Sequence, residues 1–119
     1  MTYSESELLI AIVNAIQNKK GIDIVDLNLS KLEHSITDHF VICHGNSNIQ
    51  VEAIASSVED EVKNILNINA IHKEGQRSAQ WILLNYEGIV VHVFQKEYRE
   101  HYNLEGLWAD AEIKHIANE

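Results

Sequence analysis

The sequence has 119 residues, the length of one ordinary domain, and 45% of them are hydrophobic, so the chain can bury a core. Its 18 acidic residues outnumber nine Lys and Arg residues and give a net charge of −9, which disfavours binding to bare RNA or DNA and favours a basic protein as partner. The longest apolar run, residues 8–13, has six residues, whereas a membrane span needs about 20.

Two features predict a cytoplasmic protein. The segment MTYSESELL has neither the basic region nor the apolar stretch of a signal peptide. Cys43 is the only cysteine, so the chain cannot form an internal disulfide, which suits the reducing cytosol. Because no linker, repeat or low-complexity tract interrupts the chain, we expect a single domain over residues 1–119.

The first predicted elements are a helix and two strands. Apolar residues recur at helical spacing in residues 5–20, and Gly21 is a natural helix stop. The segment IDIVDLNL, residues 22–29, is expected to be a strand whose apolar face is interrupted by Asp23 and Asp26. Residues 38–43, DHFVIC, are β-branched and aromatic and predict a second strand.

A second helix follows the turn CHGNSNIQ, residues 43–50. Ser47 and Gln50 match a capping box, in which each side chain accepts a hydrogen bond from the backbone N–H of the other residue. Gly45 is expected to provide the sharp exit from the strand. The turn has the shape of a phosphate-binding loop, but the cap explains it without a ligand. One apolar stripe marks the helix: Val51, Ile54, Ala55, Val58, Val62, Ile65 and Leu66.

The rest of the chain predicts a β-hairpin and a helical tail. A short extended piece at residues 70–73 and the polar loop EGQRSAQ precede strands at residues 81–86 and 89–94, which are joined by a turn at Glu87 and Gly88. Residues 95–119 are helical in composition. The predicted order α-β-β-α-β-β-β-α indicates an α/β domain in which helices pack on a mixed β-sheet.

The candidate reactive groups favour structural roles. No two of the seven histidines have metal-ligand spacing. Cys43 and His44 are neighbours on a strand and point to opposite faces, which favours a buried structural cysteine. A nucleotidyl-transfer enzyme needs paired acidic residues on a strand soon after the glycine turn, and none follow it. We therefore assign no catalytic, cofactor-binding or metal-ligating residue.

Aromatic residues offer a second kind of site. Trp81 and Tyr86 frame the first strand of the hairpin, and both core packing and a protein-binding hot spot stay open for them. Tyr102 and Trp108, in the tail, are expected to be packing residues.

Three segments between residues 22 and 111 resemble one known family. They are DIVDLNL, SITDHFVICHGNSNIQVEAIASSVEDEV and WILLNYEGIVVHVFQKEYREHYNLEGLWADA. Their order, spacing and motifs, above all TD.FVIC.GNS, VVHVF and R..YNLE.LW.DA, are similar to those of the ribosomal silencing factor (RsfS, or Iojap-like) family. One departure is the segment from Asn85 to Gly88, NYEG, where the family has D-Y-G-D.

The resemblance implies a nucleotidyltransferase-like fold without catalytic residues, in a protein that is not an enzyme and needs no cofactor. Family members bind the large ribosomal subunit through its fourteenth protein, at the face that the small subunit must cover. They thereby block subunit joining and lower translation when nutrients are short. The implied partner-binding residues are Trp81, with Leu83 on the same strand face, and the nearby Tyr86 and His92.

Two functions from different classes therefore remain open. One is a binding protein that excludes the small subunit sterically, with little direct nucleic-acid binding and no membrane contact. The other is a degenerate nucleotidyltransferase-like enzyme or nucleotide-binding protein. Whether the free protein forms a homodimer is also open.

Overall fold

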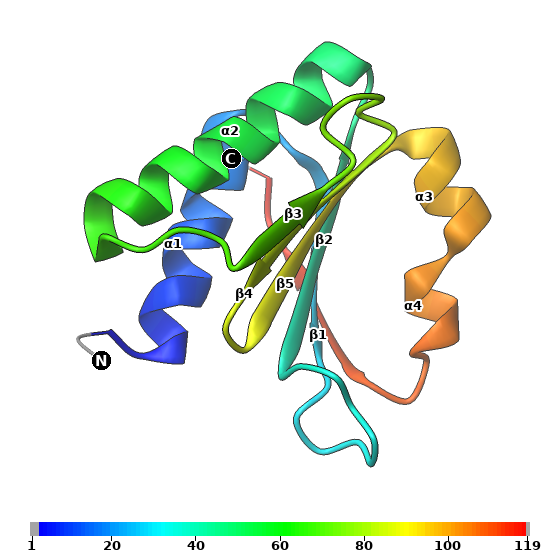
Figure 1. The fold of residues 1–119 in the computed structure, drawn as a ribbon. Coiled ribbons are helices and arrows are strands. Elements are labelled where there is room, and N and C mark those ends of the chain that lie inside the picture. Colours follow the sequence, from blue (N-terminus) through cyan, green and yellow to red (C-terminus); the bar gives the residue numbers. More distant parts are fainter. Residues whose placement is uncertain (1–2, 119) are drawn as a thin grey trace.

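A six-stranded mixed sheet forms the centre of the computed structural model, which describes residues 3–118 (Figure 1). The strand order is β3-β4-β5-β2-β1-β6; β2 and β5 are parallel, and the other neighbours are antiparallel. The elements are α1 (Glu5–Asn18), β1 (Ile22–Asn28), β2 (His39–Gly45), α2 (Asn48–Leu66), β3 (His72–Glu74), β4 (Trp81–Tyr86), β5 (Ile89–Gln95), α3 (Lys96–Tyr102), α4 (Leu104–Leu107) and β6 (Glu112–Ile116). The predicted α/β domain with a mixed sheet is confirmed.

The helices divide between the two faces of the sheet. α1 and α2 lie together on one face, and their apolar residues form the larger core with sheet residues such as Cys43 and Val91 (Figure 1). α3 and α4 lie on the other face, where Phe94 and Leu104 belong to a second, smaller core. The central strands β2 and β5 are buried on both faces, which explains why most of their residues are apolar.

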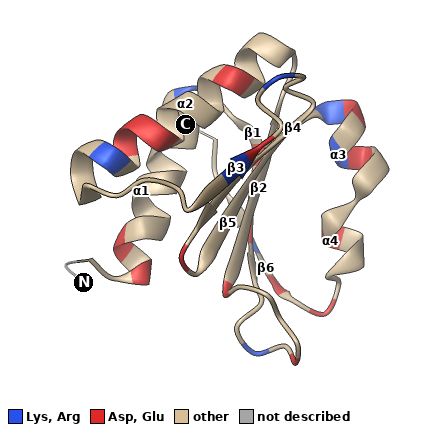
Figure 2. Cartoon of the chain, in the orientation of Figure 1, with Lys and Arg blue, Asp and Glu red and all other residues tan. Residues whose placement is uncertain are grey.

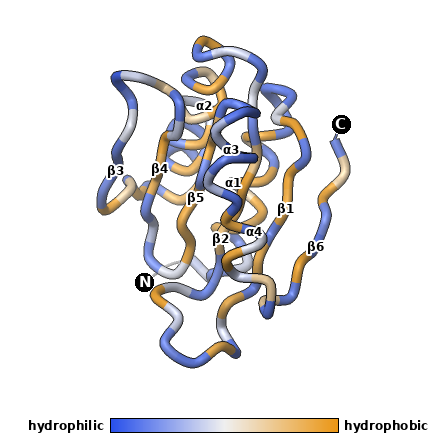
Figure 3. The backbone as a smooth tube through the Cα atoms, turned by 90° about the vertical axis from the view of Figure 1, so that its right-hand side faces the viewer, coloured by the Kyte–Doolittle hydropathy of each residue, from blue (hydrophilic) through white to orange (hydrophobic). Residues whose placement is uncertain are grey.

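Hydropathy and charge follow these layers. Hydrophobic segments of the backbone run through the strands β1 and β5, whereas α3 and the loop after β1 are largely hydrophilic (Figure 3). Charged residues lie mainly on the helices and in the loops (Figure 2). On α2, Asp60 is exposed and Glu59 accepts a hydrogen bond of 3.0 Å from Lys73 of β3. Within residues 3–118, no helix is both long and apolar enough to cross a membrane.

α1 begins with a capping box that was not predicted from the sequence. Ser4 Oγ accepts a hydrogen bond of 3.1 Å from the Glu7 N–H, and Glu7 Oε1 accepts one of 3.0 Å from the Ser4 N–H. The helix ends at Asn18, before the predicted residue 20, because Lys20 adopts a left-handed φ of 59°. Both carboxylates of its first turn, Glu5 and Glu7, lie at the positive end of the helix dipole.

The predicted capping box at the start of α2 is confirmed only in part. Ser47 Oγ accepts a hydrogen bond of 3.1 Å from the Gln50 N–H, as predicted. Gln50 Oε1, however, accepts its bond of 2.8 Å from the Asn46 N–H and not from Ser47. Gly45 is the last residue of β2, and a Cβ there would lie 3.1–3.3 Å from the Gln50 side chain. Gly45 thus leaves room for the Gln50 side chain at the point where the chain leaves β2.

The prediction of a helical tail is confirmed for residues 96–102 and 104–107 and is wrong for the end of the chain. α3 stops at Tyr102 because Asn103 takes a left-handed φ of 48°, and only the short α4 follows. The last element is β6, which pairs antiparallel with β1 at the edge of the sheet. Its residues are almost all exposed, so the segment EIKHI lacks the apolar alternation that marks a half-buried strand.

Candidate partner-binding surface

The structure separates the four predicted partner-binding residues. Successive strand residues point to opposite faces, so Trp81 and Leu83 lie on the face that α3 and α4 partly cover. They are paired in register with Phe94 and His92 of β5, respectively. Tyr86 lies on the opposite face and is buried in the core beneath α1 and α2. The expectation that Tyr86 belongs with the other three therefore conflicts with the strand geometry.

Trp81 is half-buried and held by three aromatic neighbours. Its indole N–H donates a hydrogen bond of 3.0 Å to His92 Nδ1. Its ring stacks on Phe94 with 4.9 Å between centroids, and the tilted ring of Tyr102 lies at 4.8 Å. These contacts fix the orientation of the indole and leave part of it facing solvent. We call Trp81 and Leu83 together the Trp81 surface.

His92 is buried beneath this surface and accepts the hydrogen bond of the Trp81 indole. It is 3% exposed, and burial lowers the pKa of its imidazole to about 3, so the ring is neutral at physiological pH. Because Nδ1 accepts a hydrogen bond from the indole N–H, the proton of the neutral imidazole must be on Nε2. Nε2 has no hydrogen-bond partner among the described residues, and the ring packs against Phe40 at 4.5 Å. His92 is thus a buried acceptor and not an exposed contact residue.

Tyr102, which the sequence predicts to be a packing residue, flanks the Trp81 surface. It is 49% exposed, and its ring lies near both Trp81 and Phe94. The only sequence signal was an aromatic residue within the predicted helical tail. Trp108, by contrast, is half-buried and meets Phe40 edge-on, as expected for a packing residue.

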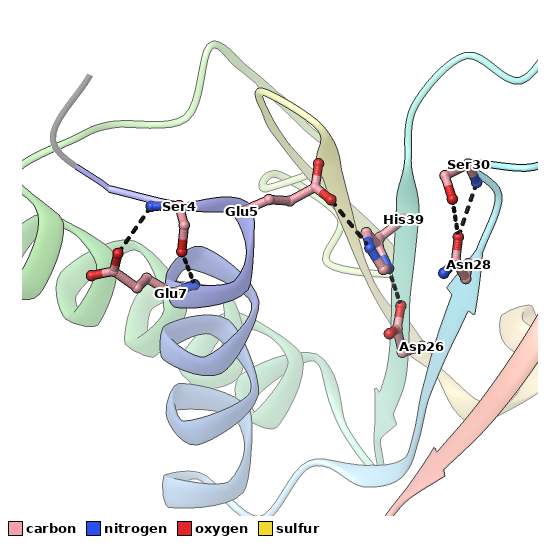
Figure 4. A network of polar contacts seen from close by, with 7 residues as sticks. All are labelled: Ser4, Glu5, Glu7, Asp26, Asn28, Ser30 and His39. Atoms are coloured by element: carbon pink, nitrogen blue, oxygen red, sulfur yellow. Dashed lines mark hydrogen bonds and ion pairs between the residues drawn. The ribbon is translucent and has the colours of Figure 1, made fainter.

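A polar network lies at the N-terminal end of α1 (Figure 4). His39 Nδ1 is 2.8 Å from Asp26 Oδ1, and His39 Nε2 is 3.4 Å from Glu5 Oε1. The hydrogen bond to Asp26 raises the pKa of His39, against the opposing effect of burial. Asp26 is 6% exposed, so the acid predicted to interrupt the strand's apolar face is instead buried in this network. The network links α1 to β1 and β2.

The other candidate reactive groups are also accounted for. Burial raises the pKa of the Cys43 thiol to about 12, so the prediction of a buried structural cysteine is confirmed. The first donors of the glycine turn, at Asn46 and Gln50, bond within the chain. Among residues 3–118, no three His, Cys, Asp or Glu side chains form a group that could hold a metal ion.

Comparisons with known proteins agree on one family. The family model described as "Ribosomal silencing factor during starvation" matches residues 2–119. The ribosomal silencing factor RsfS of Halalkalibacterium halodurans is 44% identical over 108 residues, covering 91% of each chain. That of Bacillus subtilis is 40% identical over 100 residues, covering 83% of this chain and 82% of its own. A crystal structure of a Chromobacterium violaceum protein, 33% identical, matches with a TM-score of 0.84 over 90% of this chain and 88% of that one.

Proposed function

Because the chain belongs to the ribosomal silencing factor family, we propose that it represses translation by binding the large ribosomal subunit. The contact is with the fourteenth protein of that subunit, at the face that the small subunit must cover. Occupation of this face blocks subunit joining when nutrients are short. The protein acts as a steric block in the cytoplasm and performs no chemistry.

The observation that carries this proposal is the Trp81 surface. Tryptophan is among the residues most enriched in binding hot spots, and such residues sit where a partner can exclude water from them. Trp81 is partly exposed, while its indole N–H and ring are already fixed by His92 and Phe94. An anchor that is oriented before binding loses little side-chain entropy when the partner arrives. Leu83 adds apolar area on the same strand face.

The charge of the protein supports a basic partner. A net charge of −9 repels the phosphates of ribosomal RNA at long range and attracts a basic ribosomal protein. Charge complementarity of this kind mainly speeds the encounter and selects the partner, whereas the buried contact sets the lifetime of the complex. The acidic surface and the Trp81 surface therefore have separate roles in the proposed interaction.

Co-sedimentation with separated ribosomal subunits tests the proposal. The wild-type chain should sediment with the large subunit and not with the small one. Trp81→Ala should weaken large-subunit binding by about 30-fold or more while its circular dichroism spectrum stays that of a folded protein. Ile49→Ala, which truncates an exposed apolar side chain on α2 (74% exposed), is the matched control and should bind normally.

Two outcomes would contradict the proposal. A folded Trp81→Ala variant that binds as well as the wild type would place the contact elsewhere. A rise in melting temperature with Mg²⁺ and nucleoside triphosphates would favour the nucleotide-binding alternative, because a ligand that binds only the folded state stabilises it.

A further inference from the structure

Tyr102 forms a side wall of the Trp81 surface, although it comes from a different element. Its ring centroid is 4.8 Å from that of Trp81 and 6.4 Å from that of Phe94. At 49% exposure it still presents a large part of the ring to solvent. A partner that covers Trp81 must therefore also approach Tyr102.

The position of Tyr102 depends on how α3 is attached to the sheet, and Arg99 makes that attachment. Arg99 is 7% exposed. Its Nη1 donates to the Ile22 carbonyl of β1 at 3.3 Å and to His44 Nδ1 of β2 at 2.9 Å. Its Nη2 donates to Glu105 Oε2 of α4 at 3.0 Å. One guanidinium thus joins α3 to two strands and to the following helix.

The partners of Arg99 are suited to hold this cation. A guanidinium has donors only, so His44 Nδ1 must be the acceptor and the proton of the neutral imidazole lies on Nε2. Burial, followed by the charge of Arg99, lowers the pKa of His44 and keeps it in that neutral form. Glu105 supplies the compensating negative charge. Arg99 and Tyr102 are three residues apart on α3, so both lie on the same side of the helix.

We propose that Tyr102 is a second contact residue for the partner that covers Trp81. Arg99 is the positioning residue, because its contacts fix the place of α3, and with it the Tyr102 ring, beside Trp81. This inference rests on the proposed function. It extends the contact from one strand face to a surface built from β4 and α3. It also assigns the buried guanidinium a role in binding, because a lysine could not direct several donors in one fixed plane.

The contact role is tested by titrating the full-length chain into purified large subunits. Tyr102→Ala should weaken binding by about tenfold, as expected for loss of an interface aromatic. Tyr102→Phe keeps the ring and should bind within about twofold of the wild type. Ile65→Ala, an exposed truncation on α2 at the other face of the sheet, is the control and should bind normally. Equal losses in Tyr102→Ala and Ile65→Ala would show that the effect is not local to this surface.

The positioning role is tested by a double-mutant cycle between Arg99 and Tyr102. Arg99→Lys should weaken binding in the wild-type background and cause little further loss in a Tyr102→Ala background, because its effect passes through the tyrosine. Equal losses in both backgrounds would show that Arg99 contributes only general stability. Titrations are run well below the lowest melting temperature of the set. If Arg99→Lys does not fold, Glu105→Gln, which removes the compensating charge, takes its place in the cycle.

Fluorescence supplies a readout that does not require the ribosome. In a Trp108→Phe background, emission reports on Trp81 alone, and both Tyr102→Ala and Arg99→Lys should shift it toward that of a more solvated indole. An unchanged spectrum in Arg99→Lys would contradict the positioning role.

The same titrations separate this inference from the proposed function. If the wild type binds, Trp81→Ala loses binding and Tyr102→Ala does not, only the inference is wrong. If the wild type does not bind the large subunit, the proposed function is wrong and the inference falls with it.

Discussion

The buried hydroxyl of Tyr86 gives a test of the side-chain placement. It has no hydrogen-bond partner among the described residues, and burial raises the pKa of the phenol well above its usual range. A buried polar group without a partner costs about 1–3 kcal/mol. Tyr86→Phe removes only that hydroxyl, so thermal unfolding should show unchanged or increased stability. Large-subunit binding should be unaffected, and a loss of binding in a fully folded Tyr86→Phe variant would return Tyr86 to the contact surface.

His39 predicts a specific pH dependence of stability. Its pKa in the folded state is raised above 6.5, chiefly by the hydrogen bond to Asp26. The folded state therefore binds this proton more tightly than the unfolded state does. The resulting stabilisation is fully present below pH 6.5 and is lost as the pH rises through the raised pKa.

Urea unfolding of the wild type and of His39→Gln, between about pH 6 and pH 9, measures this effect. The stability difference between the two should shrink as the pH rises. Asp26→Asn should remove most of the same pH dependence, because it removes the carboxylate that raises the pKa. A difference that stays constant or grows with pH would contradict the assignment.

At the scale of one element, the N-terminus of α2 separates a structural role from a binding role. Ser47→Ala removes the cap acceptor and should cost about 0.5–2 kcal/mol of unfolding free energy. Ser56→Ala, at an exposed position within the same helix, is the matched control and should change stability by about 0.5 kcal/mol or less. Ribosome binding by the folded fraction should not change in either variant. Lost binding at wild-type stability in Ser47→Ala would make the turn part of a site.

The elements that the sequence predicted well are those whose signals are local. The apolar stripe of α2 and the hairpin of β4 and β5 follow from periodicity and a glycine turn, and both were found where expected, except that Ile65, predicted to belong to the stripe, is 58% exposed near the end of the helix. β6 was missed because an exposed edge strand is specified by its pairing with β1 and not by its own pattern. The Gln50 side chain accepts its hydrogen bond from the Asn46 N–H, and not from Ser47, in part because Gly45 leaves room for it. The residue spacing of a capping box does not include this effect, so the bond could not be predicted from the sequence.

The candidate site, like the fold, could be predicted only where local sequence signals specify it. Strand alternation alone assigns Trp81 and Leu83 to one face and Tyr86 to the other, and the resemblance to the family favoured a binding role for the tryptophan over core packing. The position of Tyr102 beside Trp81 required knowledge of where α3 packs, which depends on the contacts of Arg99 with β1, β2 and α4. These contacts link residues far apart in sequence, so their geometry could not be read from spacing.

At the scale of the whole molecule, the proposed mechanism restricts when the protein can act. A protein that only occupies a surface changes an equilibrium by mass action and cannot drive joined subunits apart. Added to free subunits, it should reduce joining in proportion to the fraction of large subunits that it occupies. Added to joined ribosomes, it should act no faster than they dissociate spontaneously, because its binding face is then covered.

The net charge of −9 predicts how this binding depends on salt. Added salt screens the attraction between an acidic protein and a basic ribosomal protein, so the association rate with free large subunits should fall as ionic strength rises. The dissociation rate, which in the proposed complex depends on the contact at Trp81, should change much less. The protein is mixed rapidly with free subunits or with joined ribosomes at several salt concentrations. Light scattering then reports the joining or splitting of the subunits over time. Splitting of joined ribosomes faster than their intrinsic dissociation would exclude a purely steric mechanism, because only an active process can outrun spontaneous opening of the interface.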